Sequence, residues 1–114
     1  MLSLGSSHRY YLYRHPTDMR KGFDGLSGLV RNELDQDPLS GDVFIFVNRK
    51  RDRMKLLLWE RSGFVIWYKR LESGTFELPA SDARSFPLTW EKLVLILEGI
   101  SLNSIHKRKR YYRK

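Results

Sequence analysis

The sequence predicts an α+β fold, in which an antiparallel β-meander of three to five strands packs with two helices. Two observations predict it. Three apolar segments follow one another between residues 43 and 71 with only short connections between them, and this spacing favours antiparallel hairpins. On either side of these segments, apolar residues recur at steps of three and four, which is typical of amphipathic helices.

A first strand is expected within His8–His15, an aromatic segment that Pro16 ends because proline cannot donate to a β-ladder. A helix is then expected over Met19–Leu34, where one apolar face repeats at helical spacing. Thr17 or Asp18 can cap this helix, since a short side-chain oxygen accepts hydrogen bonds from the free amides of the first turn.

Gly22, Gly25 and Gly28 lie inside this predicted helix, and each weakens a helix by about 1 kcal/mol relative to alanine. Their presence predicts that another backbone approaches the helix closely. The spacing G-x-x-G-x-x-G does not match the phosphate-binding fingerprints, so a phosphate cradle is the less favoured interpretation.

The segment Asp35–Asp42 is expected to be a loop because it is rich in aspartate, proline, serine and glycine. Three central strands are expected after it, at Val43–Asn48, Met54–Glu60 and Phe64–Leu71. Thr75–Leu78 is a candidate fourth strand before Pro79. A second helix is expected at Thr89–Glu98, with Thr89 as its cap and Gly99 ending it.

Both faces of the predicted sheet are apolar, since valine and isoleucine alternate with phenylalanine in Val43–Asn48. An antiparallel sheet normally leaves one face to water. Two explanations stay open: the helices and termini cover both faces, or a partner chain closes one of them. A homo-oligomer is one arrangement that would supply such a partner. Periodicity also places Trp59, Trp67 and Trp90 in the core.

The length of 114 residues suits one domain with a single core. We expect this domain to span residues 1–105. Residues 106–114 contain little apolar material and are expected to form a basic tail that is mobile without a ligand. The N-terminus has no apolar run typical of a signal peptide, and no apolar run approaches the roughly 20 residues of a membrane span. A cytoplasmic protein without membrane contact is therefore expected.

The net charge of +8 is concentrated in two places. The tail holds six basic residues and no acidic one, and Val43–Arg70 holds eight basic and two acidic residues. The rest of the chain holds more acidic than basic residues. This separation is typical of a protein that contacts a polyanion, and a solubilising surface is the alternative interpretation.

The connection NRKRDRMK at residues 48–55 can straddle a phosphate backbone or enter a groove as a β-ribbon. Arginine suits both contacts because its planar fork matches phosphate oxygens or a guanine edge. A charged loop that discourages aggregation is the alternative. The tail adds cations and two tyrosines that can stack on unpaired bases. The candidate nucleic-acid-binding residues are Arg49, Lys50, Arg51, Arg53, Lys55, Lys69, Arg70, Lys107, Arg108, Lys109 and Arg110.

No catalytic residue, metal site or cofactor is expected. His8, His15 and His106 have no metal-binding spacing, and the absence of cysteine excludes disulfides and thiol catalysis. The acidic residues are scattered, and only Asp42 and Glu60 fall near strands that can be neighbours. A small metal-dependent nuclease is therefore the least favoured function.

Three segments, RYYLYRHPTDMRKGFDGL, DPLSGDVFIFVNRKRDRMKLLLWER and SGFVIWYKRLESGTFELP, resemble the TnpB-type accessory protein of the sixty-sixth insertion-sequence family. The resemblance runs from about His8 to Leu102 and includes the unusual motif PTDMRKG. This family is distinct from the RNA-guided nuclease that shares its name. The resemblance implies a bacterial mobile element that also encodes a second small accessory protein and a larger transposase with the catalytic acids.

The resemblance implies a non-catalytic helper in DNA transposition and supplies no catalytic residues. Combined with the charge pattern, it predicts a protein that binds DNA or the transposase–DNA complex through the basic hairpin and the tail. The principal alternative, motivated by the two apolar faces of the sheet, is an adaptor that contacts the transposase without touching DNA.

Overall fold

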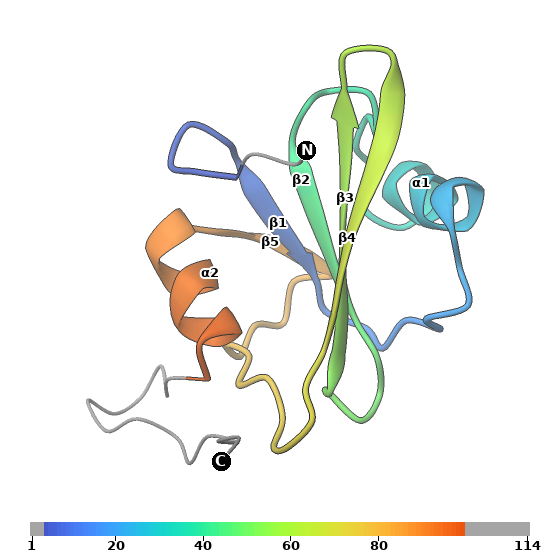
Figure 1. Ribbon diagram of the computed structural model, residues 1–114. Helices are drawn as coiled ribbons and strands as arrows, with labels where there is room; N and C mark the ends of the chain where they lie inside the picture. The colour runs from blue at the N-terminus through green and yellow to red at the C-terminus, as the bar shows by residue number, and fades with distance from the viewer. Residues whose placement is uncertain (1–3, 100–114) are drawn as a thin grey trace.

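The computed structural model describes residues 4–99 and shows a five-stranded sheet between two helices (Figure 1). The strands are β1 (Tyr10–Tyr13), β2 (Val43–Val47), β3 (Arg53–Glu60), β4 (Gly63–Arg70) and β5 (Ser85–Leu88). The helices are α1 (Phe23–Asn32) and α2 (Trp90–Leu97). The predicted α+β class is confirmed, whereas the predicted basic tail lies outside the described residues.

The strand order is β4-β3-β2-β1-β5, and β2, β3 and β4 form the predicted antiparallel meander. The expectation of a purely antiparallel sheet is wrong for one pair, because β1 runs parallel to β2 with Tyr10 opposite Val43. The cause is α1, which returns the chain to the starting end of the sheet. A parallel pair requires a crossover of this kind.

The last strand of the sheet is β5, which pairs antiparallel with β1 at the edge. The predicted strand Thr75–Leu78 is wrong, since these residues form no ladder. In β5, Pro87 is tolerated because an edge strand has one side without ladder partners.

Each apolar face of the sheet is covered by one helix (Figure 1). Helix α1 packs Leu26 and Val30 on the face that holds Phe44, and α2 packs Leu93 and Ile96 on the opposite face. Burying each of these aliphatic side chains contributes roughly 1.5–3 kcal/mol. Cover by the chain's own helices therefore explains why both faces are apolar.

The three tryptophans lie at the margins of the core and are only half-buried, in contrast to the prediction. Trp90 stacks on Tyr10 with 5.7 Å between ring centroids, and Trp59 meets Phe64 edge-on at 5.0 Å. Trp67 packs against the α2 side of the core. The middle of the core is filled instead by aliphatic side chains, phenylalanines and Tyr10.

Helix α1 begins at Phe23, later than predicted, and Gly22 is its N-cap without a side-chain hydrogen bond. The predicted capping role of Asp18 is wrong, because its Oδ1 accepts the backbone N–H of Arg20 at 2.9 Å and closes a short turn. The predicted close approach of another backbone is also wrong. A Cβ at Gly22 or Gly28 would meet no atom within 4 Å, and the three atoms nearest to one at Gly25 all belong to the Lys21 side chain.

Helix α1 begins late because Lys55 of β3 binds the segment before it. The Nζ of Lys55 donates to the carbonyl oxygens of Met19 at 2.7 Å and Lys21 at 2.9 Å. Carbonyls two residues apart lie on opposite sides of an α-helix, since each residue turns by about 100°, so they cannot converge on one ammonium. A hydrogen bond of 2.8 Å from the Thr17 N–H to the Val47 carbonyl ties the other end of this segment to β2.

The predicted α2 is confirmed in its essentials. Thr89 is its N-cap, and its hydroxyl accepts the N–H of Lys92 at 3.1 Å. Gly99 follows the helix with φ of +75°, a left-handed conformation that glycine adopts without strain.

We expect Lys55→Met to lower the free energy of unfolding by about 2 kcal/mol, because two carbonyl oxygens lose a charged donor. Urea denaturation followed by circular dichroism measures this change. Lys92→Met, at an exposed lysine on α2, is the matched control and should leave stability unchanged. Equal midpoints for the two variants would show that the Lys55 contacts do not stabilise the fold.

The pKa of Asp18 is lowered from 3.8 to about 2, first by the side-chain hydrogen bonds from Arg20 and then by its backbone N–H. A carboxyl whose pKa is lower in the folded chain stabilises the fold above its unfolded pKa, and this contribution is lost as the pH falls towards 2. Arg20→Gln should raise the Asp18 pKa towards 3.8, as measured by carbon-13 NMR titration. Arg31→Gln, at an exposed site on α1, should leave the Asp18 pKa where it is.

Candidate nucleic-acid interface

The basic connection between β2 and β3 is held in shape by Asn48. Its Oδ1 accepts the backbone N–H groups of Asp52 and Arg53, both at 3.0 Å, and its Nδ2 donates to the Asp52 carboxylate at 2.6 Å. An asparagine suits this position because one amide both accepts and donates. Arg51 takes a left-handed φ of +58° and donates its N–H to the Asn48 carbonyl.

The same connection is anchored to the segment that follows β4. The carbonyl of Arg51 accepts the N–H of Phe76 at 2.6 Å, and the carbonyl of Asp52 accepts the N–H of Leu71 at 2.8 Å. The Phe76 ring is fully buried beside the α2 side of the core. We call residues 48–52 the basic loop. Bonds to its own asparagine and to this buried anchor make it a fixed part of the fold.

The basic loop contains three basic side chains that have no partner among the described residues. The side chains of Arg49, Lys50 and Arg51 are exposed. Within the part of the chain that the structure describes, they take part in no hydrogen bond or ion pair. The loop therefore offers positive charge on a rigid backbone, which lowers the entropy that a ligand must remove on binding.

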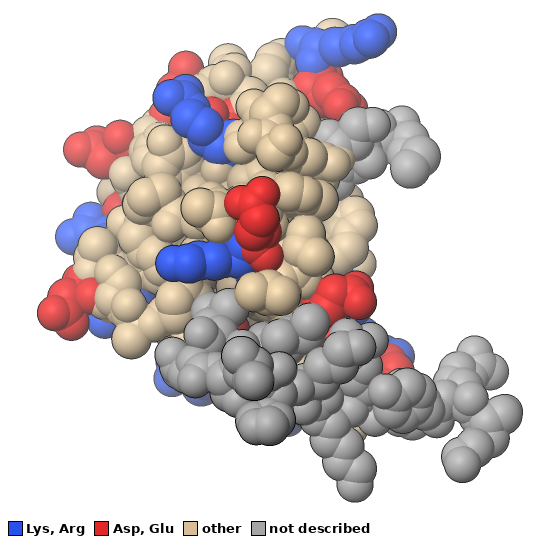
Figure 2. All heavy atoms as spheres, turned by 90° about the vertical axis from the view of Figure 1, so that its left-hand side faces the viewer, with Lys and Arg blue, Asp and Glu red and all other residues tan. Residues whose placement is uncertain are grey.

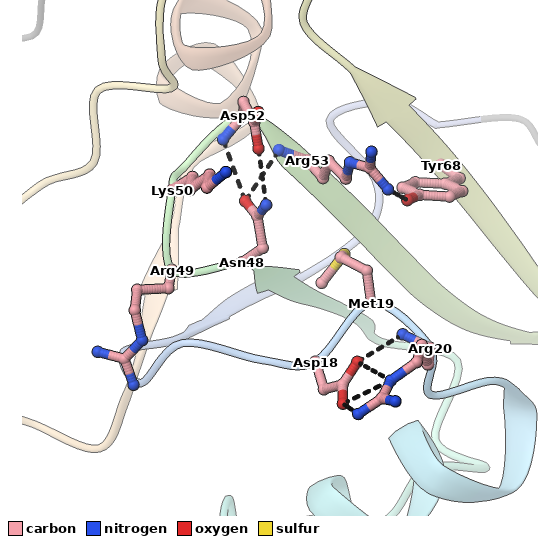
Figure 3. A pocket seen from close by; sticks show the side chains of 9 residues that line it. All are labelled: Asp18, Met19, Arg20, Asn48, Arg49, Lys50, Asp52, Arg53 and Tyr68. Carbon is pink, nitrogen blue, oxygen red and sulfur yellow. Dashed lines mark hydrogen bonds and ion pairs between the residues drawn. The ribbon is translucent and has the colours of Figure 1, made fainter.

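A hollow of about 460 Å³ lies beside the basic loop, where three separate segments of the chain meet (Figure 3). Its lining residues are Asp18, Met19, Arg20, Asn48, Arg49, Lys50, Asp52, Arg53 and Tyr68. Both of its carboxylates already have partners. Asp18 pairs with Arg20 at 2.6 Å, which also raises the pKa of Arg20, and Asp52 accepts from Asn48.

Two arginines oppose each other at the end of the β3–β4 ribbon next to this hollow. Arg53 lies directly across from Arg70 in the ladder. The Nη1 of Arg53 also contacts the Tyr68 hydroxyl at 3.3 Å, and Arg70 pairs with the exposed Glu72 at 3.0 Å. Like charges opposite one another destabilise a sheet. Such departures from local rules are expected at functional sites.

Two of the predicted nucleic-acid-binding residues bind backbone carbonyls of the protein itself. Lys55 is buried beneath the 18–22 turn, so it leaves the set of proposed phosphate contacts. Lys69 lies on the opposite face, where its Nζ donates to the Leu97 carbonyl at 3.1 Å, a favourable place for a cation at a helix C-terminus. The predicted contacts Lys107, Arg108, Lys109 and Arg110 lie outside the described residues.

The structure adds two residues that the sequence analysis did not select, Arg20 and Tyr68. Arg20 belongs to the motif PTDMRKG, whose place beside the basic loop depends on the distant Lys55. The position of Tyr68 is set by the register of β3 and β4. Glu60 pairs with Gly63 at the turn, and the same register places Tyr68 opposite Lys55. A correct turn length would therefore have located Tyr68 from sequence.

The face on which α2 lies has a different character. Basic and acidic side chains are interspersed singly over it in Figure 2. The Asp42 carboxylate pairs with Arg9 at 3.0 Å, which raises the pKa of Arg9. Nowhere in residues 4–99 do three His, Asp or Glu side chains gather in a way that could hold a metal ion. The nuclease alternative with Asp42 and Glu60 therefore gains no support from these residues.

Among the described residues, neither helix has the length and apolar character needed to cross a bilayer.

The comparisons with known proteins agree with the resemblance noted in the sequence. The family described as "IS66 Orf2 like protein" matches residues 8–107. The uncharacterized protein y4jC of Sinorhizobium fredii is 34% identical over 100 residues, covering 88% of this chain and 86% of the relative. The uncharacterized protein y4hO of the same organism is 31% identical over 100 residues, covering 88% and 87%. No solved structure matches. The chain therefore belongs to the IS66 Orf2-like family.

Proposed function

We propose that this protein is a non-catalytic accessory protein of insertion-sequence transposition that binds DNA, alone or together with the transposase. Membership of the IS66 Orf2-like family supports the accessory role. The observation that supports DNA binding is the rigid basic loop with its three free cations. Two of them, Arg49 and Lys50, line the same hollow as Arg20 and Arg53. The second accessory protein of the element is a further proposed partner.

Phosphate contact is the chemistry that this surface offers. Cations that reach phosphates release condensed counterions, and this release drives association with DNA of any sequence. The cations come from three segments that the fold holds together, so they can meet several phosphates without ordering a flexible chain. The hydrogen bonds from Leu71 and Phe76 tie the β2–β3 connection to the rest of the fold. Positioning on the DNA backbone is therefore the proposed role.

The adaptor alternative loses its original motivation, because α1 and α2 cover both apolar faces of the sheet. A homo-oligomer would therefore have to form through a surface other than these two faces. Two results together would establish an adaptor. The protein would co-purify with the transposase after nuclease treatment, and it would have no affinity for DNA.

The first test removes the cations of the basic loop. The triple variant Arg49→Gln, Lys50→Gln, Arg51→Gln should bind element-end duplex more weakly, with a log–log salt slope reduced by roughly 2.7, since each phosphate contact contributes about 0.9. Fluorescence anisotropy at several salt concentrations measures the slope.

The matched control for this test is Arg31→Gln, Arg61→Gln, Lys92→Gln, which removes the same charge from exposed sites elsewhere. The control should keep the wild-type slope. If both triple variants lose affinity equally, net charge alone governs binding and the loop is not the contact.

The second test separates binding from stability at the opposed arginines. Arg53→Gln removes one of two facing like charges, so the free energy of unfolding should stay equal or rise by about 0.5 kcal/mol. The affinity for DNA should fall roughly tenfold, because a charged hydrogen bond is lost. Chemical denaturation and anisotropy measure the two quantities.

Lys69→Gln provides the contrast for Arg53→Gln. It makes the same charge change one residue from Arg70, but it removes the bond to the Leu97 carbonyl on the other face. This variant should lose stability and keep its affinity for DNA. The opposite pattern in the two variants would place the DNA contact on the α2 face and refute the proposed surface.

A further inference from the structure

Tyr68 is a large aromatic residue left open at the point where the cover of α1 ends. Phe64 and Ile66 share its face of β4 and pack against the cluster beneath α1. Tyr68 is the next residue on that face, and it is 47% exposed. The cover that α1 provides therefore ends at Ile66. Beyond Tyr68, the last pair of residues on this face is Arg53 and Arg70.

The Tyr68 ring is held in a fixed orientation. The Nζ of Lys55, its direct cross-strand partner, lies 4.8 Å from the ring centroid, which is the geometry of a cation–π contact. Lys55 is itself fixed by the Met19 and Lys21 carbonyls. At the other end of the ring, the hydroxyl accepts from Arg53 at 3.3 Å. A ligand that packs on this ring meets a surface that is already ordered.

Open space adjoins the ring. Tyr68 and Arg53 line the hollow of about 460 Å³ and also a second one of about 290 Å³, which Arg70 completes. Both hollows are open to solvent. In Figure 3 the Arg53 side chain reaches towards the Tyr68 ring from the neighbouring strand. The site thus combines a fixed aromatic ring, adjoining space and guanidinium groups.

We propose that Tyr68 is a stacking platform for an unpaired base, and that the site binds single-stranded DNA. Aromatic rings that stack on bases, flanked by cations that hold the backbone, are the usual means of binding single strands. In a duplex the faces of the bases are occupied by their neighbours, so Tyr68 has no base to stack on there. This inference rests on the proposed function and specifies the form of DNA that the Tyr68 site takes.

The stacking contact predicts an effect that depends on the form of the DNA. Tyr68→Ala and Tyr68→Leu should bind a single-stranded oligonucleotide roughly tenfold more weakly, as expected for the loss of one base–aromatic contact. Both variants should bind the duplex of the same sequence within about twofold of wild type, since the duplex contact is with phosphates. Tyr68→Phe keeps the ring and should match wild type on both.

Anisotropy with the full chain measures these affinities, and thermal melting checks that each variant is folded. Leucine keeps much of the volume of the side chain, so it tests the π-face even if the alanine variant is unstable. Photo-crosslinking of a 5-iodouracil oligonucleotide, followed by mass spectrometry, gives a second readout. The cross-link should fall on Tyr68 in the wild-type protein.

The outcomes separate this inference from the proposed function. If the triple loop variant loses duplex binding but Tyr68→Leu binds single strands as wild type does, the stacking site is refuted and DNA binding stands. If wild-type protein binds neither form of DNA, the proposed function fails and the stacking site fails with it. An equal loss on single strand and duplex for Tyr68→Leu would also overturn the stacking role.

Discussion

The Lys55 ammonium is the contact on which the arrangement of the basic surface depends. It is a buried cation whose hydrogen-bond partners are two neutral backbone carbonyls, with a tyrosine ring beside it. A buried charge is normally neutralised by an opposite one. Here the ammonium donates two hydrogen bonds to neutral carbonyls, and among the described residues no carboxylate pairs with it. The lysine therefore adds to the positive potential of the surface above it, although it cannot reach a ligand.

This single tie has three structural consequences. It holds the 19–21 segment in a turn and so delays the start of α1. It brings Arg20 to the hollow beside the basic loop, and it orders the Tyr68 ring from below. The surface is assembled from parts of the chain that are far apart in the sequence, and one side chain near the start of β3 connects them.

The sequence predicted much of the fold from local signals. The three central strands, the intervening loop, and α2 with Thr89 and Gly99 at its ends all follow from periodicity and turn chemistry. The parallel pairing of β1 does not, because it depends on where α1 returns the chain. The short β5 carries too few residues, one of them proline, to give a strand signal of its own.

The site was predictable in composition but not in the roles of its residues. A count of charges does not distinguish Lys55, Lys69 and Arg49. In the structure the two lysines donate to backbone carbonyls, whereas the Arg49 side chain has no hydrogen-bond partner among the described residues. Register made the other difference. The predicted strands leave a connection of three residues, Arg61–Gly63, but Gly63 is paired with Glu60 in the structure. A shift of the strand register by one residue changes which side chains lie opposite each other. With the observed turn, Arg70 falls opposite Arg53 and Tyr68 opposite Lys55.

The two proposed contacts place different demands on DNA, and the fold fixes the relation between them. The basic loop requires only phosphates, which both duplex and single strand provide, whereas Tyr68 requires a base that has left its stack. Both belong to the β2–β3–β4 meander, whose ladder sets their separation, so one DNA molecule that meets both must have an unpaired base at a set distance from a phosphate run. A single strand provides both features by itself, whereas a duplex meets the Tyr68 contact only where a base has left its stack.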